Sequence, residues 1–278
     1  MSSILVCTTK VHGPINQAEE CRALLVDKEG FSSDIDFNNI IPPPPFLNID
    51  VDAFTVEGAL FAYGLYMKEF EHVDLFSDEV FLANVYRKSF ILDFIRKKYE
   101  TWDHQPIGLK IDRNSTKSIP YSDDESNTSF AEYVLHGKIY YHHLARYGYA
   151  TLYGWRCDHW GDDMNADGGT MSEIVDNGDG TGDFSFHYRS YERLPYHIIM
   201  ALHKKFDMLS FTGHWYEPSF MYASMGIWEL RDEDIYLLVA GDVKEESCRI
   251  VCEEIGLGYE NYLSILADYG YEDSEDEE

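Results

Sequence analysis

Basic residues are scarce in this sequence, and their scarcity excludes several classes of ligand. The chain has 22 Lys and Arg residues against 50 Asp and Glu residues, which gives a formal net charge of −28. Nucleic acids and anionic membranes are bound through clustered Lys and Arg, because these residues neutralise phosphates. We therefore expect no direct contact with nucleic acid or membrane, and we expect a partner with a basic surface.

Long apolar runs and a disulfide framework are also missing. No run approaches the ~18 residues that a membrane span requires, and the opening MSSILVCTTK lacks the basic start and unbroken apolar core of a signal peptide. The cysteines are odd in number and widely spread, as is typical of a reducing compartment. They are Cys7, Cys21, Cys157, Cys248 and Cys252. We expect a cytoplasmic protein.

Catalytic signatures are absent too. The sequence contains no glycine-rich phosphate loop after a strand, no G-x-S-x-G elbow and no cysteine in an electropositive context. We therefore predict that the protein is not an enzyme, and we assign no catalytic residue and no cofactor.

Aromatic residues, by contrast, are plentiful at 15%, and the hydrophobic share of 45% is ample for a packed core. The chain is organised around residues 147–218. There, Phe184, Phe186 and Tyr188 alternate with polar residues, a helical pattern follows, and a second alternating segment starts at Leu209. Two strands joined through one helix are expected to share a sheet.

Residues of this stretch carry a family resemblance, and a weaker match lies upstream. The matching residues are Tyr147-Gly148, Trp155, Trp160-Gly161, Asn165-Ala166, Phe184, Phe186, Pro195, Leu202, Phe206, Phe211 and Gly213, with Val6-Cys7, Val11 to Gly13 and Phe37 to Pro42 upstream. Together they resemble the YubB ferredoxin-like domain, a family found in phage and plasmid proteins, over roughly half of the chain. The family has no established activity. The resemblance therefore implies a fold and a mobile-element origin in a bacterial host cytoplasm, and no catalytic residues.

We predict an α+β protein with a ferredoxin-like split β-α-β sheet, a helical insertion and a C-terminal α/β extension. The strands expected in one sheet are Ile4–Val11, Phe31–Asn38, Asp183–Glu192 and Leu209–Tyr216. The predicted parts are the core at 1–42 and 147–230, the insertion at 43–146 with a polar loop at 112–128, the extension at 231–267, and a disordered acidic tail at 268–278.

The insertion begins with four prolines, Pro42 to Pro45, and then shows helical spacing of apolar residues. We expect helices after Thr55 and Ser77, which are plausible N-caps, and a third from Ser129. As the last elements of the chain we expect strands near 222–230 and 235–240, followed by two helical segments.

Three groups of residues invite a metal interpretation. His136, His142 and His143 lack the four-residue spacing that stacks two ligands on one helix face. The segment Asp176 to Asp183 resembles a calcium loop but has no Glu at its last ligand position, so it is better explained as turn chemistry. The acidic turn after Trp160, with Asp162 and Asp163, has the oxygen ligands for a divalent cation, but we interpret it as a solvated turn and predict no structural metal.

Residues that contact a partner or a second copy are expected at two places. One is the acidic turn with Asp162 and Asp163. The other is the C-terminal extension, where Cys248 and Cys252 lie four residues apart on a predicted helix and Tyr259 and Tyr262 follow. We expect a homo-oligomer, with these positions as the candidate contacts.

Three classes of function stay open. The favoured class is a phage or mobile-element interaction protein that inhibits a host antiphage defence complex by blocking its basic nucleic-acid-binding surface; a Gabija-type complex is one candidate. The first alternative is a metal-dependent enzyme that uses the acidic turn after Trp160. The second is a single-stranded nucleic-acid-binding module that stacks bases on a ferredoxin-like sheet, and the acidic charge argues against it.

Overall fold

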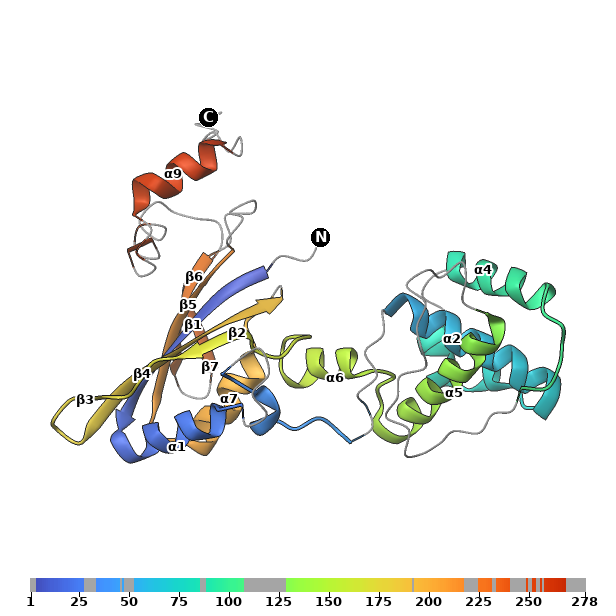
Figure 1. Cartoon of the computed structure of the whole chain (residues 1–278), viewed down its shortest axis with the longest axis horizontal. Coiled ribbons are helices and arrows are strands. Elements are labelled where there is room, and N and C mark those ends of the chain that lie inside the picture. The colour runs from blue at the N-terminus through green and yellow to red at the C-terminus, as the bar shows by residue number, and fades with distance from the viewer. Residues whose placement is uncertain are drawn as a thin grey trace. The chain divides into compact units, whose positions relative to one another are not determined.

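The computed structural model describes residues 4–27, 34–45, 47, 53–85, 89–107, 129–191, 193–217, 225–231, 234–240, 249, 252–253, 256 and 258–268. The chain divides into two units (Figure 1). The sheet unit combines Met1–Pro42 with Arg156–Glu278, and the helical unit is Pro43–Trp155. Each is described by itself.

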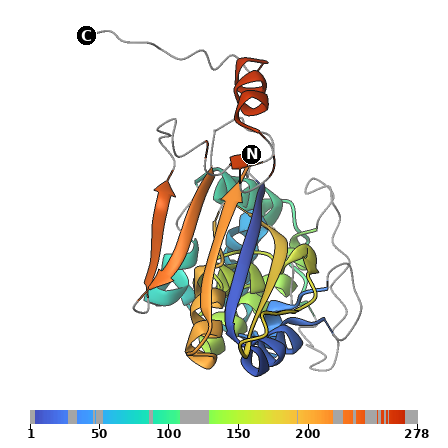
Figure 2. The ribbon, with the colours of Figure 1, turned by 90° about the vertical axis from the view of Figure 1, so that its left-hand side faces the viewer.

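The sheet unit contains one antiparallel sheet. Its described strands are β1 (Ile4–Pro14), β2 (Asp167–Met171), β3 (Val175–Asp176), β4 (Thr181–Tyr191), β5 (Ser210–Tyr216), β6 (Met225–Arg231) and β7 (Asp234–Ala240). Their order is β2-β4-β1-β5-β6-β7, and β3 also pairs with β4. Helices α1 (Ile15–Leu25) and α7 (Tyr196–Lys205) follow β1 and β4, and both lie on the same side of the sheet (Figure 2).

The order β2-β4-β1-β5 is that of a ferredoxin-like sheet, because β1-α1-β2 and β4-α7-β5 form two split β-α-β halves. The predicted α+β class is therefore confirmed. Three of the four expected strands are direct neighbours, since β1 pairs with both β4 and β5. β6 and β7 extend the same sheet beyond β5.

The expected strand at Phe31–Asn38 is wrong within its described part. Ile35 makes an isolated bridge to Val26, and Phe37–Asn39 form a 3-10 helix, η1. The cause is local, because the Asp36 side chain accepts the backbone N–H of Asn38 at 2.9 Å and turns the chain. The second strand of the ferredoxin-like order is β2, which follows the helical unit in the chain.

Alternation along β4 is confirmed by burial. Phe184, Phe186 and Tyr188 are 4%, 1% and 2% exposed. Ser185, His187 and Arg189 between them are half-buried or exposed, so the apolar residues define the face that is packed against α1 and α7.

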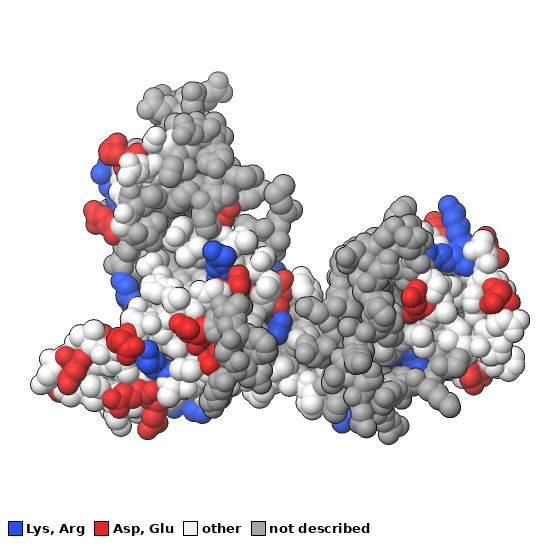
Figure 3. Space-filling view, viewed as in Figure 1, with Lys and Arg blue, Asp and Glu red and all other residues white. Residues whose placement is uncertain are grey.

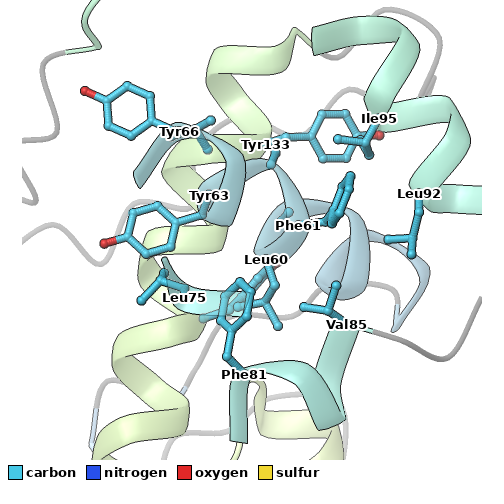
Figure 4. Packing of buried hydrophobic residues seen from close by; sticks show 14 of the residues in the cluster. Leu60, Phe61, Tyr63, Tyr66, Leu75, Phe81, Val85, Leu92, Ile95 and Tyr133 are labelled. Carbon is cyan, nitrogen blue, oxygen red and sulfur yellow. The ribbon is translucent and has the colours of Figure 1, made fainter. Parts of the chain in front are cut away.

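The helical unit packs several helices around a core of aromatic and aliphatic residues (Figure 4). Its elements are α2 (Ala53–Tyr66), the π-helix η2 (Met67–Glu71), the 3-10 helix η3 (Leu75–Ser77), α3 (Glu79–Val85), α4 (Ser89–Glu100) and α5 (Phe130–Tyr147). Helix α6 (Leu152–His159) crosses the boundary between the units. The polar loop predicted at 112–128 lies outside the described residues.

Two helix starts differ from the sequence prediction and one agrees. Thr55 lies inside α2, which begins at Ala53. Asp78, rather than Ser77, accepts the Phe81 N–H at 2.9 Å and so caps α3. α5 starts as predicted after Ser129, whose side chain forms a reciprocal capping box with Glu132.

The C-terminal part is described in pieces, including the helix α9 (Tyr259–Asp268). Of the helix predicted to carry Cys248 and Cys252, the described residues Arg249, Cys252 and Glu253 are helical; its other residues and most of the acidic tail lie outside the described residues. Across the described ranges, no helix has the length and apolar composition that crossing a membrane requires.

Close approach of α2 and α5 depends on one glycine. A Cβ added to Gly137 of α5 would lie 1.9 Å from the backbone oxygen of Ala59 in α2. Because that neighbour is backbone, the two helices would have to separate to admit a methyl group.

We therefore expect Gly137→Ala to destabilise the helical unit by about 1–3 kcal/mol, the usual cost of overpacking. Urea denaturation followed by circular dichroism measures this loss. Gly154→Ala in α6 is the matched control, because its nearest neighbour is 3.9 Å away and the change should be neutral or favour the helix. Equal stability of the two variants would contradict the close contact.

Candidate functional site

The acidic turn after Trp160 is packed into the interior of the sheet unit. The Trp160 side chain is fully buried, and its indole N–H donates to the Ile41 carbonyl at 2.9 Å. Gly161 follows at φ +83°, and a Cβ there would lie 3.1 Å from the Tyr196 nitrogen. The tight turn brings Asp162 inside, where its side chain is 2% exposed.

Asp162 is held by the end of β4. Its Oδ1 accepts the Tyr191 N–H at 3.2 Å and the Asp163 N–H at 2.8 Å, while its Oδ2 lies 2.6 Å from the Ser190 Oγ. The interpretation as a solvated turn is therefore wrong for Asp162. Its carboxyl group satisfies backbone donors that would otherwise be buried without a partner.

The surroundings of Asp162 favour neutral groups. Burial raises the pKa of Asp162 to about 7, although hydrogen bonds from Ser190 and Tyr191 act in the opposite direction. Burial also raises the pKa of the Cys7 thiol and of the Tyr188 hydroxyl far above their usual ranges. Asp163 is half-buried, and its Oδ1 has no hydrogen-bond partner within the described ranges.

The histidines of α5 belong to the core of the helical unit. His136 and His143 are 6% and 8% exposed, and burial lowers the pKa of each, so both are neutral near pH 7. His143 Nδ1 lies 3.1 Å from the Ala150 carbonyl. Within the residues that the structure describes, no three His, Cys, Asp or Glu side chains gather as a metal site would require.

The C-terminal candidates differ in exposure. Cys252 and Tyr262 are buried at 0% and 1% exposure, while Tyr259 is half-buried with the Arg249 guanidinium 4.3 Å from its ring centre. Cys248 lies outside the described residues. That these four residues and the acidic turn contact a partner stays a prediction, and Asp163 and Tyr259 are the members with accessible surface.

The β3–β4 hairpin carries a cluster of exposed carboxylates. Asp176 and Asp179 are exposed at its tip, and the Glu173 side chain is 90% exposed. Glu19 and Glu20 are exposed on α1, which packs beside the hairpin through the 3.1 Å bond from the Ile15 N–H to the Gly180 carbonyl. We call these five residues the acidic surface; Figure 3 shows carboxylates gathered over this region.

Hydrogen bonds fix the hairpin in the way its turn residues predict. Asp176 accepts the Gly178 N–H at 2.8 Å, and Asp179 accepts the Thr181 N–H at 3.0 Å. Hydrogen bonds from the Thr181 side chain and backbone lower the pKa of Asp179. Asp179 therefore stays ionised, and the turn chemistry expected for Asp176 to Asp183 is observed as the turn of a hairpin.

A polar cluster in the helical unit was missed by the sequence reasoning. Glu69 of η2 accepts hydrogen bonds from the Tyr99 hydroxyl and from His104, whose Nδ1 lies 2.8 Å from Oε1. Burial raises the pKa of Tyr99 to about 12, and the hydrogen bond to Glu69 and the charge of Glu69 contribute to the rise. Such a carboxylate–imidazole pair orients the second ring nitrogen for proton transfer or binding.

Backbone geometry marks the same place. His72, directly after η2, and His104 are the positive-φ residues other than glycine in the described ranges, at 54° and 53°. A pocket of about 290 Å³ adjoins this region and is lined by Lys98, Thr101, Trp102, Asp103, Ser129 and Phe130. π-Helices and left-handed residues recur at functional sites, so this cluster is a second candidate site.

Comparison with known proteins adds little to this geometry. No family model matches the chain, and no curated protein matches it. Among solved structures, the chain is similar to the protein api92 from Yersinia pseudotuberculosis, described by the family model DUF1281. The TM-score is 0.35 and the identity 10%, with 87% of this chain and 100% of that chain covered. A likeness this low carries no argument, and the YubB resemblance stays an expectation.

Metal removal tests the acidic turn. Because both Asp162 oxygens are committed to protein partners, we expect the melting temperature to be the same with and without a strong chelator. Differential scanning calorimetry of the full chain measures this. A drop of several degrees on chelation would contradict the assignment and favour a metal-dependent activity at the turn.

Proposed function

We propose that this chain is a phage or mobile-element interaction protein that binds a basic, nucleic-acid-binding surface of a host antiphage defence complex and blocks it. The observation that carries the proposal is the net charge of −28, together with the acidic surface on α1 and the β3–β4 hairpin. Carboxylates on a rigid hairpin compete with phosphates for the same Lys and Arg residues.

Local cations leave most of this surface negative. Arg22 pairs with Glu173 at 3.1 Å, and His12 pairs with Asp183 at 2.6 Å behind the hairpin tip. Asp176 and Asp179 have hydrogen-bond donors but no ion pair within the described ranges. The tip therefore supports contact with a basic partner, a Gabija-type complex being one candidate.

The metal-dependent alternative has less support. It requires Asp162 and Asp163 as ligands, but Asp162 is buried and hydrogen-bonded to Ser190 of β4. The cluster around His104 would support a different activity, acid–base catalysis. Its carboxylate partner Glu69 is consistent with that role, but the cluster identifies no substrate. A direct nucleic-acid-binding role is opposed by the charge.

The test begins with co-purification of the tagged chain from a bacterial host and identification of the retained protein. A DNA-binding assay on that target, with and without saturating chain, then measures blockade. We expect binding to DNA to be lost in the complex, and we expect the complex to weaken as salt rises. Undiminished DNA binding in the saturated complex would refute blockade.

Charge variants locate the contact. The double change Asp176→Asn with Asp179→Asn keeps the carbonyl oxygens that accept the hairpin hydrogen bonds and removes two charges. We expect affinity for the target to fall roughly two- to thirtyfold, from ~0.2–1 kcal/mol for each exposed ion pair. Glu79→Gln with Glu100→Gln removes two exposed carboxylates from the helical unit and is the matched control. If the control weakens binding as much as the hairpin variant, the acidic surface is not the contact.

A further inference from the structure

The number of hydrogen atoms available around Ser190 bears on the protonation state of Asp162. The Ser190 Oγ lies within hydrogen-bond distance of two acceptors, the Asp162 carboxyl group and the Arg193 backbone carbonyl. A serine hydroxyl carries one hydrogen and can donate to only one of them. Both contacts are satisfied if Asp162 is protonated, because its O–H then donates to Ser190 and Ser190 donates to Arg193.

No opposite charge compensates an ionised Asp162. The titratable groups that face it are Cys7 on β1, Tyr188 on β4 and Asp163 in its own turn, and each of these is neutral or negative. In the described ranges, no Lys, Arg or His forms an ion pair with it. An ionised carboxylate in this position would be buried without a counter-ion, which is strongly unfavourable.

The Asp162 carboxyl group and its neighbours join three parts of the sheet unit. Asp162 binds the end of β4 through Ser190 and Tyr191, and Ser190 binds the connection to α7 through Arg193. The same turn holds Ile41 through the Trp160 indole. Loss of the proton would leave one hydrogen, that of Ser190, for two acceptors, the Asp162 carboxylate and the Arg193 carbonyl, so one of the two contacts at this junction would be lost.

We propose that the turn Trp160–Ala166 is a proton-dependent latch, closed when Asp162 carries a proton and loosened when Asp162 ionises. The group's pKa of about 7 places the transition near neutral pH. The latch does not rest on the proposed function, since it concerns a buried junction in which no residue of the acidic surface takes part.

The sign of the pH effect follows from the two states. The pKa of Asp162 rises from 3.8, its ordinary value, to about 7 in the folded protein. Between these values the folded chain keeps a proton that the unfolded chain releases, so stability falls as pH rises. Above about 7 both states are ionised and the loss levels off. Where the folded chain binds one proton more than the unfolded chain, the folding equilibrium constant falls tenfold for each unit that the pH rises.

Asp162→Asn is the diagnostic variant, because asparagine reproduces the protonated acid. Its Oδ1 can accept the N–H groups of Tyr191 and Asp163, and its amide can donate to Ser190. We expect this variant to lose the one-proton dependence and to exceed the natural chain in stability at pH 7 to 8. Urea denaturation from pH 4 to 8 measures both. Asp158→Asn, an exposed acid on α6, is the control for charge and should retain the dependence.

Direct observation of the proton completes the test. The 13C resonance of the Asp162 carboxyl group in the natural chain should titrate near pH 7, and a midpoint near 4 would overturn the proposal. Exchange of the Trp160 indole and Tyr191 amide hydrogens should be faster in the natural chain than in Asp162→Asn at pH 8, and equal at pH 5. Equal exchange at both pH values would show a buried acid that controls no latch. Histidines with a lowered pKa, such as His187, are present in all the variants, so their contribution to the pH dependence of stability cancels in the comparison.

Discussion

Pairing of β1 with β4 on one side and β5 on the other is the constraint on which the sheet unit depends. β1 holds the centre of the ferredoxin-like order, and its two partners both come from the second half of the chain. Thr8 and His187, which face each other across β1 and β4, are 179 residues apart in the chain. Contacts of this separation are costly in loop-closure entropy, so the sheet is expected to form late.

The helical unit instead draws its contacts from one continuous segment of the chain, Pro43–Trp155. α2 and α5 pack through Gly137, while α3 and α4 add Phe81 and Ile95 to the same core (Figure 4). This unit can form from its own residues, whereas the sheet cannot form until β4 and β5 pair with β1. We therefore expect the helical unit, whose segment is continuous, to form before the sheet, whose strands come from both ends of the chain.

Much of the fold was predictable because apolar alternation is a strong signal. Phe184, Phe186 and Tyr188 identified β4, and the capping pair Ser129 and Glu132 marks the start of α5. β2 gave no such signal, because its sequence DGGTM has two glycines and little apolar surface. Only pairing with β4 makes it a strand. Phe31–Asn38 had the better pattern, but the side chain of Asp36 ended the extended backbone.

The sites were less predictable because burial and long-range contact decide them. Asp162 and Asp163 are adjacent and chemically identical, yet Asp162 is enclosed because Trp160 and Gly161 turn the chain inward. Glu69 and His104 are 35 residues apart and meet through a left-handed histidine that no propensity indicates. Charge and turn chemistry, which are local properties, did identify the hairpin that carries the acidic surface.

The 2.9 Å bond between Trp160 and Ile41 has a consequence for the history of the chain. It ties together two points of the sheet unit that flank the entire helical unit in sequence, so the entry and exit of that unit lie side by side. The arrangement is that of a single insertion into one connection of the sheet unit, which leaves the pairing of the strands unchanged. By the same geometry, recombination could exchange this module for another, leaving the sheet, its junction and the acidic hairpin unchanged.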